Sequence, residues 1–345
     1  ELRGLRKTYG GQHAVYAIDL SVRRGEFLTL LGASGSGKST ILMMIAGFTD
    51  PSAGDILLRE HSILRLPAHR RGVGIVFQSY ALFPHLTVFE NIAYGVRKQA
   101  RKKDELASRV SDMLRLVKLE AFAGRYPDQL SGGQQQRVSV ARALAPGPEI
   151  LLLDEPLGAL DKSLREHMLI ELRHIHRSLG TTMIFVTHDQ REAMAMSDRI
   201  AILNAGRIAA LGTPRKLYAE PETAFVAGFL GEANILQVRT DDDRVVAGAD
   251  GTRLASASPR TSAILLRPEH ARFGDLPEIS LLFSGRVRET LFLGDRIKYE
   301  IITPGGERLL AYADAGLDGP RLTAEGEVRL GWRAADIRYL QEDIA

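Results

Sequence analysis

The sequence lacks three features that would assign it to particular classes of protein. It contains no cysteine, which excludes disulfides, thiolate zinc sites and a cysteine nucleophile. It has no run approaching the ~18 consecutive apolar residues that span a bilayer, so we expect any membrane contact to pass through a partner. It also lacks an excess of one charge, since 45 Lys and Arg oppose 42 Asp and Glu and leave a net charge of +3. So small an excess gives no indication of nucleic-acid binding.

The length of 345 residues and the hydrophobic content of 45% are sufficient for two or three folded domains. The chain starts at Glu1 without an initiator methionine and without an apolar signal core. We therefore expect a trimmed start.

Residues 1–232 alternate between apolar runs of strand length and helical patterns. Four such runs occupy residues 27–31, 74–77, 150–153 and 183–186. Near-continuous apolarity is typical of strands that are covered on both faces of a sheet. Lys162–Leu179 carries Leu and Ile at helical spacing, and Asp161 is placed to cap its start. The pattern predicts an α/β fold with a mainly parallel sheet.

Residues 233–345 show a different sequence pattern, in which short β-type runs are separated by turn residues. The runs are residues 235–239, 263–266, 285–290, 296–302 and 327–330. The predicted turns are residues 241–243, 249–251, 294–295 and 304–306. Short strands without a long helix predict a small all-β barrel or sandwich as a second domain.

A glycine-rich segment matches the P-loop pattern without a mismatch. A strand-like run leads into it, and a helical pattern over residues 39–46 follows it and stops at Gly47. Such a loop turns its backbone N–H groups toward phosphate oxygens. Lys38 would add positive charge at the terminal phosphates and Ser39 a hydroxyl ligand for Mg²⁺. The predicted phosphate-binding residues are Gly32, Ser34, Gly35, Ser36, Gly37, Lys38, Ser39 and Thr40.

Two carboxylates and a histidine follow other predicted strands. Asp154 and Glu155 end the apolar run that starts at Ile150, where ligands bind in an open α/β sheet. We expect Asp154 to hold Mg²⁺ and Glu155 to take a proton from the attacking water. His188 closes another apolar run, where a group near the γ-phosphate is expected.

The sequence Leu130-Ser131-Gly132-Gly133-Gln134, followed by Gln135-Gln136-Arg137, resembles the signature of ABC ATPases. Other motifs of that family appear in the same order along residues 2–232. Tyr9 resembles the residue that stacks on adenine, Gln78 the Q-loop glutamine, residues 158–161 the D-loop, and residues 186–189 the histidine switch.

This resemblance implies a two-lobed ATPase domain over residues 1–232, with a helical signature lobe at about 79–145, that works as a homodimer with ATP and Mg²⁺. Each ATP would lie between the P-loop of one subunit and the signature of the other. The implied catalytic residues are Lys38, Gln78, Glu155 and His188, and the implied metal ligands are Ser39, Gln78 and Asp154. Beyond the P-loop, the implied nucleotide contacts are Tyr9, Ser131, Gly132, Gly133, Gln134 and Asp161.

The segment after Gln78 is apolar in a region that should belong to the helical lobe. Residues 80–86 include Tyr80, Leu82, Phe83 and Leu86. Ordinary packing of the lobe is one interpretation. The other is a groove that receives a short helix from a membrane subunit, and the resemblance to importer ATPases favours it.

The C-terminal part is similar to the small β-barrel module called TOBE. The similarity rests on residues 266–270 and on residues 285–287 and 294–295. Such modules follow the ATPase domain in importers of the polyamine, ferric iron, sulfate and maltose groups. Residues 231–234 resemble the polyamine and iron branch, which makes a polyamine or ferric iron the implied solute. Whether the module binds a regulatory ligand or strengthens the dimer stays open.

Together the motifs predict an ATPase subunit of an ABC importer, bound peripherally at the cytoplasmic face of the inner (plasma) membrane. Its expected partners are transmembrane permease subunits and, indirectly, a solute-binding protein, and no nucleic acid.

Other classes of protein carry the same motifs. A DNA-repair or chromosome-associated ABC ATPase would insert long coiled coils, whereas about ninety residues without sustained heptads separate Ser39 from Ser131. A translation-factor type would need two cassettes, and this chain has one P-loop. An exporter ATPase remains an alternative because its chemistry is identical, although exporter domains usually lack a TOBE-like tail. A pure binding protein is disfavoured by the presence of both Glu155 and His188.

Overall fold

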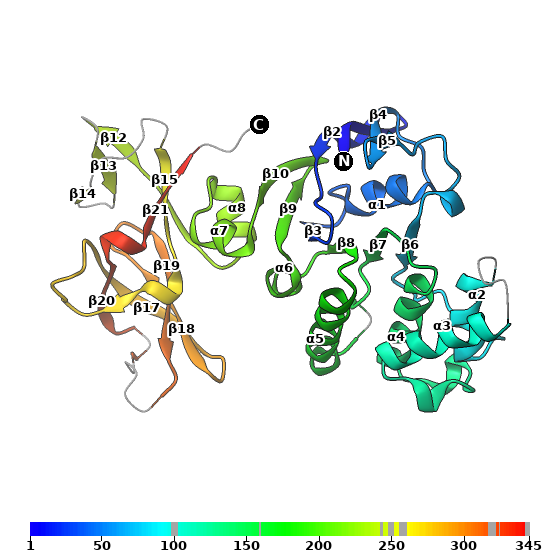
Figure 1. Cartoon of the computed structure of the whole chain (residues 1–345). Helices are drawn as coiled ribbons and strands as arrows, with labels where there is room; N and C mark the ends of the chain where they lie inside the picture. The colour runs from blue at the N-terminus through cyan, green and yellow to red at the C-terminus, as the bar shows by residue number, and fades with distance from the viewer. Residues whose placement is uncertain are drawn as a thin grey trace. The chain divides into compact units, whose positions relative to one another are not determined.

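The structure is a computed structural model of the whole chain (Figure 1). It describes residues 1–97, 103–158, 160–241, 244–247, 252–254, 261–316, 322–323 and 325–341. The chain divides into two compact units, Glu1–Pro214 and Arg215–Ala345. Within the described residues, every helix is too short or too polar to cross a membrane.

The first unit is built on a six-stranded sheet with the strand order β10-β9-β3-β8-β7-β6. All neighbouring strands are parallel except β9 and β10, which form an antiparallel pair at one edge. The α/β prediction with a mainly parallel sheet is therefore confirmed. The strands are β3 (Phe27–Gly32), β6 (Val73–Val76), β7 (Ile150–Asp154), β8 (Thr182–Thr187), β9 (Arg199–Asn204) and β10 (Arg207–Gly212).

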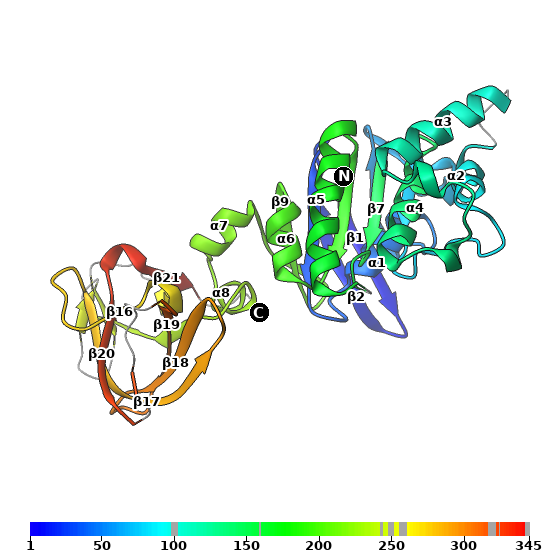
Figure 2. The same cartoon turned by 90° about the horizontal axis from the view of Figure 1, so that it is seen from below.

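The central strands β3, β7, β8 and β9 are buried on both faces, which explains their continuous apolar runs. Side chains of a strand point alternately to opposite faces, and two cores result. On β3, Leu28 and Leu30 face the core that contains α1 (Lys38–Ala46), whereas Phe27 faces the core that contains the helices of the other side. Figure 2 shows α5 and α6 on one face of the sheet.

A second sheet, antiparallel and four-stranded with the order β2-β1-β4-β5, packs on the α1 side. Sequence analysis did not identify its strands. The clearest missed signal is Gly10-Gly11, where both residues have positive φ, 53° and 85°, in a two-residue turn between the paired Tyr9 and Gln12. The strands are β1 (Leu2–Tyr9), β2 (Gln12–Leu20), β4 (Ala53–Leu58) and β5 (His61–Ser62).

The predicted helices are confirmed where the sequence identified them. Helix α1 ends at Gly47, whose φ of 85° allows its N–H to reach back to the last turn. Helix α5 covers Lys162–Leu179, and its N-cap Asp161 accepts a hydrogen bond from the Leu164 N–H at 2.9 Å. The other helices of this unit are α2 (Val88–Val96), α3 (Lys103–Leu116), α4 (Gly132–Leu144) and α6 (Gln190–Met196).

The second unit is mainly β, as expected, with the five-stranded sheet β16-β20-β17-β18-β19 and two three-stranded sheets. Its core contains the fully buried Trp332 and Tyr299. The predicted run 296–302 coincides with β18, while β16, β19 and β21 were missed because they are short or flanked by charged residues. The predicted turns 241–243 and 249–251 lie wholly or partly outside the described residues. The strands are β11 (Asn234–Gln237), β12 (Arg239–Asp241), β13 (Arg244–Ala247), β14 (Thr252–Leu254), β15 (Thr261–Leu266), β16 (Arg272–Phe273), β17 (Leu281–Phe292), β18 (Arg296–Ile302), β19 (Arg308–Asp314), β20 (Glu327–Trp332) and β21 (Ile337–Gln341).

The compact units divide earlier in the chain than the predicted boundary at 232/233. Helices α7 (Pro214–Ala219) and α8 (Ala224–Phe229) account for the difference. The buried guanidinium of Arg267, which follows β15, donates to the carbonyls of Tyr218 and Ala227 at 3.3 and 3.1 Å. These bonds join both helices to the β unit.

Helix α5 allows a test of the hydrophobic core on the face of the sheet that it covers. Leu172 is completely buried, whereas Leu179 on the same helix is 41% exposed. We predict that Leu172→Ala lowers the free energy of unfolding by about 2–5 kcal/mol, and that Leu179→Ala lowers it by less than about 1 kcal/mol. Urea unfolding of both variants, followed by far-UV circular dichroism, measures the difference. Equal losses would contradict the assignment of Leu172 to the core.

Candidate functional site

The P-loop joins β3 to α1 and has a backbone that requires glycine. Gly37 has φ 99°, and a Cβ at this position would lie 2.5 Å from the Ala14 carbonyl oxygen of β2. At Gly32 a Cβ would lie 2.6 Å from the Leu203 carbonyl oxygen. The loop is thus clamped between the two sheets, while Ser34 and Gly35 at its tip are exposed. A rigid loop of this kind holds its N–H groups in place for an anion.

Lys38 lies inside this loop. Its side chain is buried, and its ammonium group donates hydrogen bonds to the carbonyls of Gly32 and Ala33, each at 2.8 Å. Burial lowers the pKa of Lys38, and the carboxylates of Glu155 and Asp154 oppose that shift. A partly desolvated cation in a loop of this shape suits a polyphosphate ligand.

Ser39 and Asp154 come from different elements and meet beside the loop. The Ser39 hydroxyl donates to Asp154 Oδ1 at 3.1 Å. Burial raises the pKa of Asp154, the Ser39 hydrogen bond lowers it, and the neighbouring Glu155 raises it further. Two adjacent oxygen ligands in a partly buried place fit Mg²⁺, which takes few protein ligands and completes its shell with water and phosphate oxygens.

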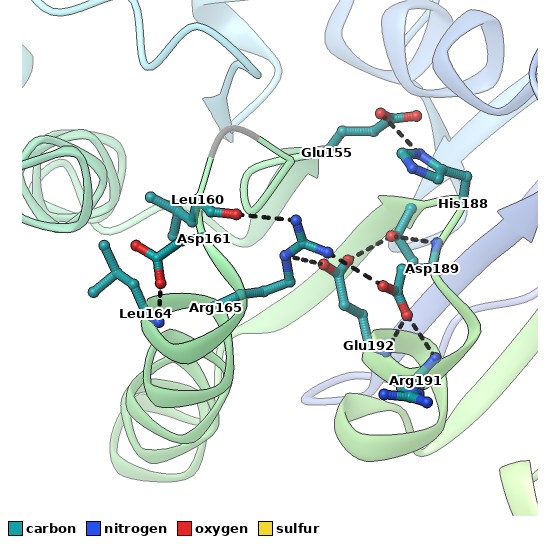
Figure 3. Close-up of polar contacts among 10 residues, drawn as sticks. Glu155, Leu160, Asp161, Leu164, Arg165, His188, Asp189, Arg191 and Glu192 are labelled. Atoms are coloured by element: carbon teal, nitrogen blue, oxygen red, sulfur yellow. Dashed lines mark hydrogen bonds and ion pairs between the residues drawn. The ribbon is translucent and has the colours of Figure 1, made fainter. Parts of the chain in front are cut away.

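Glu155 and His188 form the second pair of the site. His188 Nδ1 and Glu155 Oε2 are 3.1 Å apart, as Figure 3 shows. Glu155 has a positive φ of 42°, which is uncommon for a residue with a side chain. Its N–H bonds to the Val186 carbonyl of β8 at 3.0 Å, which holds this conformation in place. His188 is 62% exposed, so its ring is accessible to a ligand.

Gln78 follows β6 and is succeeded by a strained segment. Tyr80 and Ala81 have φ values of 59° and 47°, two consecutive non-glycine residues in the left-handed region. The Tyr80 carbonyl accepts hydrogen bonds from Ser139 and Arg142 of α4, both at 3.0 Å, and the Ala81 carbonyl accepts one from Arg142 at 2.7 Å. Helix α4 therefore fixes the path of the chain just after Gln78.

The apolar residues of this segment divide between the core and the surface. Tyr80 is buried and Leu82 packs against the core of the helical region. Phe83 instead contacts Tyr94, whose ring centroid is 4.5 Å away and whose side chain is 54% exposed. Packing of the lobe thus explains the first two residues, and Phe83 with Tyr94 is left as an accessible aromatic pair.

The signature residues start helix α4. Ser131 is the N-cap, and its hydroxyl accepts from the Gln134 N–H at 3.4 Å, while the Gln134 side chain accepts from the Ser131 N–H at 2.9 Å. This reciprocal pair is a capping box. A Cβ at Gly133 would lie 3.0 Å from Leu164 Cδ1 of α5, so α4 and α5 pack closely here and a larger residue would have to displace the Leu164 side chain. Ser131 itself is exposed.

The remaining candidates lie farther along the edges of the unit. Tyr9 at the end of β1 is 51% exposed, and Lys7 Nζ lies 4.9 Å from its ring centroid. Thr40 is on the first turn of α1. Asp161 caps α5 with its side chain, and the preceding Ala159 of the predicted D-loop lies outside the described residues. Among the described side chains, the structure thus brings together Lys38, Ser39, Asp154, Glu155 and His188, and it places Tyr9, Ser131 and Asp161 on surfaces apart from this group.

Comparisons with known proteins match both parts of the chain. Residues 15–158 match the ABC transporter family and residues 264–340 the TOBE domain. The spermidine/putrescine import ATP-binding protein PotA of Trichodesmium erythraeum is 45% identical over 90% of this chain and 86% of its own length. The PotA protein of Nitratidesulfovibrio vulgaris is 47% identical over 90% and 88%. The chain belongs to the ABC transporter family.

Solved structures agree with this assignment. The dimeric, post-hydrolysis state of the ATP-binding cassette MJ0796, bound to ADP and phosphate, is 35% identical and has a TM-score of 0.56 over 62% of this chain and 98% of that one. CbiO1 from Clostridium perfringens is 30% identical, with a TM-score of 0.59 over 63% and 88%. This chain is an ATP-binding subunit of the ABC importer type, with an ATPase fold followed by a TOBE domain, and the predicted family and fold class are confirmed.

Sequence analysis missed the residues that hold the site in position. Arg142, Ser139, Arg165 and Glu192 make the polar contacts between elements around Gln78 and His188. Nothing in the local sequence distinguishes these side chains from ordinary polar residues on helices.

The Glu155–His188 pair yields a direct test. We predict that Glu155→Gln lowers the turnover of ATP by about 10²- to 10⁴-fold, because it removes the carboxylate expected to act as the general base. Its affinity for ATP should stay within about threefold, because the P-loop is untouched. Steady-state phosphate release and equilibrium binding of a fluorescent ATP analogue measure the two quantities. Glu166→Gln, on the exposed face of α5, is the matched control, and normal turnover by Glu155→Gln would remove Glu155 as the base.

Proposed function

We propose that this subunit hydrolyses ATP at the cytoplasmic face of the inner membrane to drive import of a polyamine of the spermidine or putrescine class. Support for the solute comes from relatives that are named as spermidine/putrescine import proteins and are 45% and 47% identical over 90% of this chain. These names favour a polyamine over ferric iron, the other solute that the sequence implied. A solute-binding protein and the permease subunits would select the polyamine, and this subunit would supply the energy.

The observation that carries the ATPase part is the convergence of four strand ends. The P-loop follows β3 and Gln78 follows β6. Asp154 ends β7 and Glu155 follows it, and His188 follows β8. In this proposal Gly32–Thr40 bind the phosphates and Tyr9 stacks on the adenine. Ser39, Asp154 and Gln78 would hold Mg²⁺, which supplies charge neutralisation at the phosphate oxygens.

The pair of Glu155 and His188 would act on the attacking water. Glu155 accepts its proton, and His188, within hydrogen-bonding distance of Glu155, fixes the position of the carboxylate and contacts the γ-phosphate. Lys38 would release its bonds to Gly32 and Ala33 as it turns to the phosphates. The apolar strands behind the site exclude water from one side of it.

We further infer a homodimer in which Ser131, Gly132, Gly133 and Gln134 of one copy contact the ATP of the other. The capping box satisfies Ser131 and Gln134 within their own helix and leaves the exposed N-terminus of α4 directed outward. A helix N-terminus of this kind attracts anions. Asp161, at the N-terminus of α5, would lie in the same dimer contact. ATP would then close the dimer, and hydrolysis would open it.

We propose that the aromatic pair of the half-buried Phe83 and the exposed Tyr94 forms part of the contact with a permease subunit and links the site to transport. The four residues between Gln78 and Phe83 include the strained Tyr80 and Ala81, whose carbonyls Arg142 holds. A change at Gln78 would therefore be transmitted to this surface. We propose that residues 1–232 act as the ATPase domain and residues 233–345 as a TOBE-like domain that is either regulatory or part of the dimer contact.

The dimer proposal is tested at Ser131. We predict that Ser131→Arg lowers ATP turnover by about tenfold or more, which corresponds to ~1.4 kcal/mol or more of closure free energy. The affinity of the monomer for ATP should remain within about threefold, because the P-loop of the same chain is unchanged. The substitution removes only the N-cap of α4, which costs about 1 kcal/mol of helix stability. Sedimentation with ATP in the Glu155→Gln background reports dimer formation directly. Unchanged turnover and an unchanged dimer would count against the sandwich.

The transport proposal is tested by isolation of the complex. We predict that tagged Glu155→Gln protein, extracted from native membranes with ATP present, carries a pair of multi-span membrane proteins identified by mass spectrometry. The wild-type complex reconstituted with its binding protein should hydrolyse ATP faster with spermidine or putrescine than with ferric iron. Recovery of soluble partners or nucleic acid alone would leave the ATPase chemistry and refute the importer role.

A further inference from the structure

One polar cluster in the ATPase unit has no role in the chemistry described above. Arg165, on the first turn of α5, lies between the residues that precede its own helix and the residues that follow His188 (Figure 3). Its guanidinium Nη2 donates to the Leu160 carbonyl at 3.0 Å, and its Nη1 donates to Asp189 Oδ2 at 3.4 Å. One side chain thus connects the D-loop segment to the residue next to His188.

The other end of the cluster is a buried carboxylate. Glu192 is only 4% exposed and lies with Oε1 3.7 Å from Arg165 Nε. Its Oε2 accepts the hydroxyl proton of Thr187, and the same Thr187 oxygen accepts the Asp189 N–H at 3.0 Å. The residues on both sides of His188 are therefore fixed to Glu192, directly or through one bond. Burial raises the pKa of Glu192 and the Asp189 carboxylate adds to this, whereas Arg165 lowers it.

Asp189 completes the connection through the backbone. Its Oδ1 accepts the N–H groups of Arg191 and Glu192 at 2.7 and 3.2 Å, which caps α6. Its other carboxylate oxygen, Oδ2, accepts the hydrogen bond from Arg165 Nη1. The two oxygens of one carboxylate therefore hold α6 and α5, and His188 is the residue directly before that carboxylate.

Arg165 is connected to the signature helix α4 through Leu160 and Leu164. Leu160, whose carbonyl accepts from Arg165, has its Cδ2 3.4 Å from where a Cβ of Gly132 would be. Leu164, the neighbour of Arg165, packs against Gly133 in the same way. Both contacts are within one chain. A displacement of the start of α4 would press on the segment that Arg165 holds, and a rigid packed contact transmits such a shift.

We propose that Arg165 is a positioning residue that sets the place of His188 relative to Glu155 and makes it depend on the D-loop segment and the start of α4. This inference rests on the proposed roles of Glu155 and His188. Arg165 touches neither of them. It acts through Asp189 and Glu192, and its forked, planar donor group is what allows one side chain to hold a carbonyl and two carboxylates at once.

The consequence for ATP turnover follows from geometry. A displacement of a catalytic group by about 1 Å can lower a rate by about 10²-fold. We predict that Arg165→Gln lowers kcat for ATP by about 10- to 100-fold and changes the KM for ATP by less than about threefold. Arg165→Lys, which keeps the charge and loses the fork, should recover part of kcat.

Arg173→Gln is the matched control. Arg173 lies on the same helix α5 and also reaches α6, where it donates to the Ala195 carbonyl, but it makes this contact away from His188. We expect kcat within about twofold of the wild type for this variant. Thermal melting of both variants separates a loss of stability from a loss of positioning.

A double-mutant cycle decides whether Arg165 acts through His188. If it does, Arg165→Gln should lower the turnover of His188→Ala by less than about twofold, because the ring that it positions is already gone. Losses that multiply in the double variant would overturn the proposal, and so would a normal kcat for Arg165→Gln.

A spectroscopic readout keeps this test separate from the proposed function. In protein labelled with ¹⁵N-histidine, with the His188 signals assigned by His188→Ala, the ring signals of His188 should move in Arg165→Gln and stay in place in Arg173→Gln. This NMR measurement requires no ATP turnover. A change in the His188 signals therefore supports the positioning role even if Glu155→Gln shows that the catalytic assignment is wrong. Unmoved His188 signals in Arg165→Gln would overturn the inference.

Discussion

The parallel alignment of the central sheet is the constraint on which the site depends. Leu31 pairs with Thr187 and Asp154 pairs with Val186, so β3, β7 and β8 end at the same level. Parallel strands present all their carboxyl ends at one edge. The P-loop, the two carboxylates and His188 therefore emerge together, although more than a hundred residues separate the first from the last. Burial on both faces of the sheet keeps this edge rigid.

Three residues near this edge of the sheet have strained backbone conformations, and polar contacts between elements stabilise them. Glu155, Tyr80 and Ala81 all have positive φ, a conformation that side chains disfavour by roughly 1–2 kcal/mol each. A bond to Val186 holds Glu155, and Arg142 with Ser139 holds the other two. Strained residues that neighbouring elements hold in place are typical of functional sites.

Sequence reasoning reached the parallel sheet, the P-loop, α5 with its Asp161 cap and the mainly β C-terminal part, because each has a short-range pattern of its own. It missed the antiparallel sheet, whose partly exposed strands carry both apolar and polar residues. It also did not identify α7 and α8, which the long-range contacts of Arg267 join to the β unit. The proximity of Glu155 to His188 reflects the pairing of β7 with β8, whereas Ser39 follows β3 and Asp154 ends β7, and these two strands lie on either side of β8. The strand order could not be read from the sequence, so these groups were expected at one site from their places at strand ends and from the resemblance to ABC ATPases.

The two arginines that sequence reasoning missed explain how separate elements behave as one site. Arg142 joins α4 to the segment after Gln78, and Arg165 joins the start of α5 to the residues around His188. Helix α4 starts with the signature and packs on α5 through Gly133 and Leu164. A single helix thus contacts both the strained segment that leads to Phe83 and the segment that Arg165 holds. In the proposed mechanism, a shift of α4 would reach both the surface proposed for the permease and the Glu155–His188 pair. This one helix would then link ATP hydrolysis to transport.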